Sequence, residues 1–84
     1  MPEIFELNGM SIKMLYRDHD DPHVHIYRHD IELAVVQLDG TLRNGNLEPD
    51  KLKVLRTWMK MKHEELMVCW LKASKGLKPG RIKI

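Results

Sequence analysis

The chain of 84 residues has a single cysteine, few aromatic residues and no long hydrophobic run. With Cys69 alone, no disulfide can form within the chain, which excludes the small disulfide-stabilised secreted scaffolds and favours a reducing compartment. The longest apolar run covers residues 66–71, far short of the roughly 20 residues that a membrane-spanning helix needs. We therefore expect a cytoplasmic protein that does not cross a membrane.

The sequence also lacks the motifs that would identify several enzyme classes directly. It has no glycine-rich phosphate loop, no pair of cysteines for zinc and no serine nucleophile motif. Residues 1–84 are predicted to form one domain, because two halves of about 40 residues would each be too small for a stable core. Within it we distinguish a β-hairpin region (1–47), a helical region (48–76) and a basic tail (77–84).

Charge is distributed unevenly, although the formal net charge is only +2. Residues 1–50 hold ten acidic and four basic side chains, whereas residues 51–84 hold two acidic and ten basic ones. The basic half could bind nucleic acid, an acidic partner protein or the acidic half of its own chain. The sequence leaves these three alternatives open.

Dipeptides that favour tight turns divide the first half of the chain into short segments. Asn8-Gly9, Asp39-Gly40 and Asn44-Gly45 favour the positive φ angles of hairpin turns. Between them, apolar and polar residues alternate as they do in half-buried strands. We expect an antiparallel sheet of three to five strands, drawn from residues 3–7, 10–17, 23–28, 31–38 and 41–43.

A helical region follows Pro49, a residue that suits the first turn of a helix. No residue interrupts the region before Gly76, so the pattern predicts an α+β fold with one long or kinked C-terminal helix packed on one face of the sheet. A straight helix over residues 49–75 would be about 40 Å long, too long for so small a domain. We expect that it bends or splits around residues 60–65, or that its surplus length packs against a second chain. The tail at residues 81–84 is expected to be a short edge strand or a partly ordered arm.

Two apolar rows follow this helical region. The first row is expected to face the sheet and form the core, and it consists of Leu52, Leu55, Met59, Leu66, Cys69, Trp70 and Ala73. The second row, Val54, Met61 and Val68, lies on another side of the helix and cannot contact the same sheet. It favours a homodimer or a small cognate partner protein, with singly exposed apolar residues as the alternative.

A basic flank lies beside the core row. Lys53, Arg56 and Lys60 are spaced by three and four residues, which places them on one side of a helix. Such a row can bind phosphate groups, so these three are candidate nucleic-acid-binding residues. The alternative is that they only keep the helix surface soluble.

The chemically richest segment spans residues 18–27, with three of the five histidines. On a strand, His23 and His25 would point to the same side with Cα atoms about 7 Å apart, a spacing from which both imidazoles can bind one metal ion. His19 or Asp21 could supply a third ligand and leave an open position, as in catalytic zinc sites. A divalent metal such as zinc held by His19, His23 and His25 is therefore one hypothesis, and exposed histidines without a ligand are the alternative.

The same histidines suit acid–base catalysis without a metal, because imidazole titrates near neutral pH. His23 or His25 would act as the base or acid of phosphodiester cleavage, with Tyr27, Arg28 or Arg56 stabilising the phosphate charge.

His63 on the helix borders the core row, and it is expected to approach His23 or His25 beside Trp70. His19 is its alternative partner. The candidate catalytic residues are therefore His23, His25, His63 and Tyr27.

Several motifs together resemble a family of small bacterial proteins called domain of unknown function 4160. They are the opening Met-Pro-x-Ile, the segment Asp-His-x-x-Pro-His-Val-His, the later Asp-Gly turn, and the helix pattern of Trp58, His63, Leu66 and Trp70. The resemblance covers nearly the whole chain. It departs from the family at Asp21, where a proline is common, and at the ending Ile82-Lys83-Ile84.

The resemblance implies a short cytoplasmic bacterial protein, often encoded beside another small family in a pairing that looks like a toxin–antitoxin module. It establishes no activity, so whether the protein is an enzyme stays open. Three functions are considered: a toxin-like component acting on RNA through its histidine cluster, a non-catalytic partner- or nucleic-acid-binding module, and a metal-binding domain.

Overall fold

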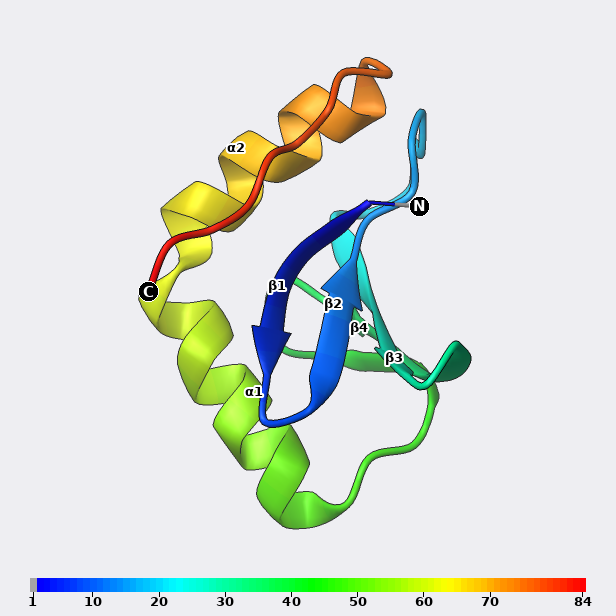
Figure 1. Ribbon diagram of the computed structural model, residues 1–84, viewed down its shortest axis with the longest axis vertical. Helices are drawn as coiled ribbons and strands as arrows, with labels where there is room; N and C mark the ends of the chain where they lie inside the picture. The colour runs from blue at the N-terminus through cyan, green and yellow to red at the C-terminus, as the bar shows by residue number, and fades with distance from the viewer. Residues whose placement is uncertain (1) are drawn as a thin grey trace.

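A five-stranded sheet followed by two helices forms the protein, as seen in a computed structural model that describes residues 2–84 (Figure 1). The strands are β1 (Glu3–Leu7), β2 (Met10–Lys13), β3 (His23–Arg28), β4 (Ile31–Gln37) and β5 (Leu42–Gly45). They lie in the order β1-β2-β3-β4-β5, and each adjacent pair is antiparallel. The expected α+β class and antiparallel sheet are confirmed.

The strand expected over residues 10–17 ends earlier, at Lys13. Arg17 has a φ of 58°, which an extended strand cannot accommodate. Its backbone N–H donates to the Ala73 carbonyl, 2.8 Å away, near the end of the second helix. The segment after β2 therefore leaves the sheet and packs against that helix.

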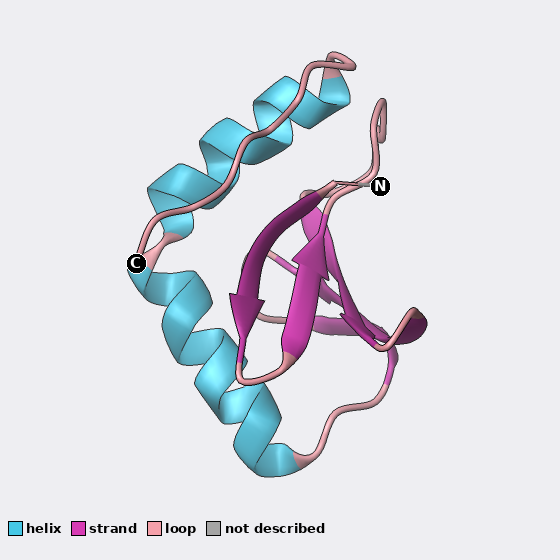
Figure 2. Ribbon diagram, viewed as in Figure 1, coloured by secondary structure: helices cyan, strands magenta, loops and turns pink. Residues whose placement is uncertain are grey.

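The prediction of a single long helix is wrong, because the helical region forms two helices, α1 (Pro49–Met61) and α2 (His63–Ser74). Lys62 separates them with φ −107° and ψ 20°. Its N–H still donates to the Trp58 carbonyl and its carbonyl accepts from the Leu66 N–H, both at 2.9 Å. The break falls within the expected segment 60–65, and Figure 2 shows the two helices set at an angle around the sheet.

One hydrophobic core joins the sheet to both helices. From the strands it takes mainly Ile4, Met10, Ile12, Val24, Ile26 and Val36. From the helices it takes six members of the expected core row, Leu55, Met59, Leu66, Cys69, Trp70 and Ala73, with Leu52 packed at its edge. Leu55 and Leu66 have no exposed surface at all. The predicted sheet-facing side of the helical region is therefore confirmed.

The tail after α2 runs back along that helix (Figure 1). Ile82 is buried, and its N–H donates to the Ile4 carbonyl at 2.8 Å. Arg81 Nη1 lies 2.7 Å from a carboxylate oxygen of Glu3. Residues 81–84 form no strand, so the tail is a loop fastened to β1. None of the helices in residues 2–84 is long and apolar enough to cross a membrane.

The second apolar row lies outside the core, with 71 % of Met61 and 51 % of Val68 exposed. Pairing of this row with a second copy stays a prediction. We expect the pure protein to sediment as a dimer at micromolar concentration and Met61→Glu to sediment as a monomer, because the interface would bury an unpaired charge. A wild-type monomer would contradict the homodimer.

Candidate metal centre

Strand β3 places two histidines side by side. Val24 and Ile26 are fully buried in the core, and because successive side chains of a strand point to opposite faces, His23 and His25 point to the other face. Their ring centroids are 5.1 Å apart. The side chain of His23 is 5 % exposed and that of His25 is 12 % exposed.

The loop after β2 brings a carboxylate to these rings. The backbone contact of Arg17 with α2 fixes the start of this loop, and the next residue, Asp18, has Oδ2 2.9 Å from His23 Nε2. One candidate ligand atom from each of Asp18, His23 and His25 lies within 4.8 Å of the other two. Two imidazoles and one carboxylate thus converge on one point.

The Nδ1 atom of each imidazole lies beside an oxygen acceptor. His23 Nδ1 lies 2.7 Å from the Asp21 backbone carbonyl, and His25 Nδ1 lies 2.6 Å from the Glu32 carboxylate. The Asp21 carbonyl and the ionised Glu32 carboxylate can only accept, so each Nδ1 is the donor of its contact. Each Nε2 is then the nitrogen that a metal ion could bind. The Asp18 carboxylate beside His23 Nε2 is also an acceptor, so this nitrogen donates to it unless a metal ion takes the place of the proton. Histidine ligands of metal ions are commonly oriented by such outer partners.

His25 Nε2 is buried and has no hydrogen-bond partner in the part of the chain that the structure describes. Most buried polar atoms are paired, and an unpaired one costs about 1–3 kcal/mol. A metal ion bound by Asp18 and the two Nε2 atoms would give this nitrogen its missing partner.

Arg43 and Asp20 form the rim of the site. Arg43 of β5 pairs with the carboxylate of Asp20, and this cation holds the pKa of Asp20 below its usual range. Arg43 Nη1 also lies 3.1 Å from His23 Nδ1. When Nδ1 donates its hydrogen to the Asp21 carbonyl, both atoms of this contact are donors, so it is not a hydrogen bond. The pocket in front of the histidines measures about 220 Å³, room for water and a small group.

Helix α2 reaches the site through Trp70. Its indole centroid lies 5.1 Å from that of the His23 ring, and the side chain is buried. The sequence predicted a contact between the histidine strand and this helix through His63. The structure instead places His63 in solvent at the start of α2.

Other predicted site residues lie apart from the converging group. His19 is exposed, and the third member of the group is Asp18 in place of His19. Tyr27 pairs with Glu32 beside a bulge in β4, and Lys13 Nζ lies 4.7 Å from its ring centroid. His63 lines a separate cavity with Arg56 and Lys60, whereas Lys53 lies beside Trp58 and Met61.

Sequence reasoning missed Glu32 and Arg43 and did not select Asp18 as a ligand. The register of the β3–β4 hairpin, which pairs Tyr27 with Glu32, would have indicated Glu32 as a neighbour of His25. Arg43 lies 20 residues from His23 along the chain, and no local pattern points to it.

A model of a protein family described as "Domain of unknown function (DUF4160)" matches residues 9–71 of the chain. The matched range includes the three converging residues and reaches into α2. Comparisons with curated proteins and with solved structures found no match.

Proposed function

The chain belongs to the DUF4160 family, whose description assigns no activity, and we propose that it is a metal-binding protein with a hydrolytic centre. In this proposal Asp18, His23 and His25 hold one divalent transition-metal ion, with zinc as the expected metal. The observation that supports it is the convergence of one ligand atom from each residue within 4.8 Å of the others.

The donor set accounts for the choice of metal. Imidazole nitrogen suits zinc and its neighbours among the transition metals, and a carboxylate is a common third ligand of zinc. Three protein ligands leave a coordination position for water, as catalytic zinc sites do. A bound ion would lower the pKa of that water and make hydroxide available near neutral pH.

The contacts of His23 favour a metal ion over a metal-free acid–base pair. Its Nδ1 is held by the Asp21 carbonyl and its Nε2 lies 2.9 Å from the Asp18 carboxylate. Neither nitrogen can exchange a proton with a substrate without losing a partner. A metal ion between His23 and Asp18 would use both groups as ligands.

Arg43 supports an anionic substrate, and we propose a phosphodiester, with RNA as the form that a toxin-like role requires. The pair of Arg43 with Asp20 is open to water, since the Asp20 side chain is 61 % exposed. Surface ion pairs contribute little stability, so Arg43 can exchange Asp20 for a phosphate oxygen. Its position beside His23 Nδ1 places the guanidinium at the rim of the centre.

The test is cleavage of an RNA oligonucleotide by protein with and without metal. We expect zinc-loaded protein to cleave it, chelator-treated protein to be inactive, and added zinc to restore the activity. Asp18→Ala should abolish cleavage, whereas His19→Ala, which removes an exposed histidine from the same loop, should leave it intact. Cleavage that survives chelation, or that Asp18→Ala retains, would contradict the proposal.

A further inference from the structure

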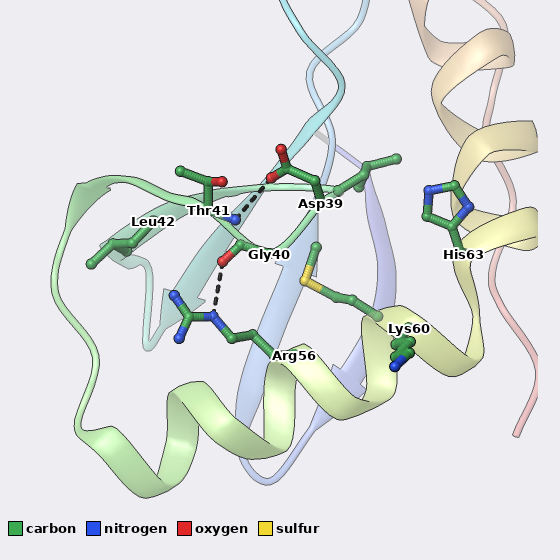
Figure 3. A pocket seen from close by; sticks show the side chains of 9 residues that line it. Asp39, Gly40, Thr41, Leu42, Arg56, Lys60 and His63 are labelled. Carbon is green, nitrogen blue, oxygen red and sulfur yellow. Dashed lines mark hydrogen bonds between the residues drawn. The ribbon is translucent and has the colours of Figure 1, made fainter.

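A second cluster of basic side chains lies on the helix side of the turn between β4 and β5 (Figure 3). Arg56 and Lys60 of α1 and His63 of α2 line a cavity of about 880 Å³ together with residues 38–42. A space of this size can hold a nucleotide. Leu42 lines this cavity, whereas Arg43, the next residue of β5, lines the pocket of the histidine site.

The turn itself holds Arg56 in place. Its Nε donates to the Gly40 carbonyl at 2.9 Å, as the dashed line in Figure 3 marks. That bond orients the guanidinium and leaves both terminal nitrogens free to donate to a phosphate in a fork. Within residues 2–84, neither Arg56 nor Lys60 forms an ion pair with an acidic side chain.

Asp39 is the acidic residue that lines this cavity, and its carboxylate binds the backbone of the β4–β5 turn. Its Oδ1 accepts the Thr41 N–H at 2.9 Å, and this hydrogen bond lowers the pKa of Asp39. The carboxylate therefore stays ionised and engaged with the turn. The two helix cations, with His63 at the edge of the cavity, remain available to an anion.

We propose that this cavity binds the phosphate group of a nucleotide or of an RNA strand through Arg56 and Lys60. Two unpaired cations, one of them oriented by the backbone, face a cavity large enough for the group that they would bind. The proposal does not depend on the metal centre.

Binding of three probes to chelator-treated protein tests it: inorganic phosphate, uridine monophosphate and a fluorescent single-stranded RNA. We expect Arg56→Ala and Lys60→Ala each to weaken binding of the nucleotide or the RNA by about 10- to 100-fold, the usual range for charge-assisted hydrogen bonds. Tight binding of the mononucleotide would identify a nucleotide site, and binding of RNA alone a strand site. Affinity should fall as salt rises.

Lys53→Ala is the matched control, because it removes the same charge from the same helix outside the cavity. It should leave binding nearly unchanged. Equal losses in Lys53→Ala and Lys60→Ala would mean general attraction to a basic helix and would overturn the proposal. Absence of binding by all three probes would overturn it too. Lys60 makes no hydrogen bond or ion pair through its side chain within residues 2–84, so its variant should keep the wild-type melting temperature.

Discussion

Replacing His25 by alanine should lower the affinity of the protein for zinc by more than about 100-fold. The reason is that His25 would supply one of only three ligands, and even outer partners that merely orient a ligand are worth about 10- to 100-fold. Competition with a chromophoric chelator measures the affinity. The metal-free variant should remain folded, because it loses one exposed hydrogen bond, that of His25 Nδ1 with Glu32, while His25 Nε2 has no partner in the described part of the chain.

Two further variants are compared with His25→Ala for their zinc affinity. Glu32→Gln keeps the shape of the partner of His25 Nδ1 but removes its charge, so it should lower zinc affinity by about tenfold. His19→Ala removes an exposed imidazole from the same loop and should leave zinc affinity unchanged. If His19→Ala weakened zinc binding as much as His25→Ala, the assignment of Asp18 as the third ligand would fail.

Replacing Leu55 by alanine should reduce the free energy of unfolding by about 2–5 kcal/mol, the usual cost of emptying a fully buried leucine site. Leu55 has no exposed surface and lies where α1 meets the sheet. A domain of this size has a total stability of roughly 5–15 kcal/mol, so the variant should be close to unfolding. Urea denaturation followed by circular dichroism measures the change.

The adjacent residue supplies the control for this measurement. Val54 is 38 % exposed, and Val54→Ala should change the free energy of unfolding by only about 0.5 kcal/mol. Equal effects of the two substitutions would show that α1 packs through a different face. Such a rotation would also move Arg56 away from the β4–β5 turn and remove the cavity proposed to bind phosphate.

Local patterns in the sequence were sufficient to predict an antiparallel sheet, although Asn44 and Gly45, expected to form a turn, lie in β5 and pair with β4. Asn8 and Gly9 adopt the positive φ angles that their hairpin requires, at 49° and 78°, and β3 alternates as its residue types predict. The end of β2 could not be predicted, because it depends on the contact between Arg17 and Ala73, which are distant in the sequence. Strand pairing between neighbours is a local property, whereas the packing of a loop on a remote helix is not.

The length of the helical region predicted a break, but no residue type identified its position. Lys62 is neither glycine nor proline, and its conformation follows from both helices packing on one core. His63 illustrates the consequence for the site. Its position on one continuous helix suggested a contact with the histidine strand, yet after the break it faces solvent, and Trp70 makes the contact with His23.

The candidate site was predictable where it depends on one strand. Alternation along β3 was enough to pair His23 with His25. The choice of Asp18 over His19 depends on how the loop after β2 turns, and Arg43 reaches the site only because β5 pairs with β4. Ligands from a single strand can be predicted from spacing, whereas ligands from loops require the fold.

Anomalous diffraction at the zinc absorption edge, from crystals of the zinc-loaded protein, tests the metal centre most directly. The expected result is one strong peak bonded to His23 Nε2, His25 Nε2 and a carboxylate oxygen of Asp18, at about 2.0–2.2 Å from each. A map without a peak between these three side chains, or with zinc bound only to other residues, would contradict the proposed centre.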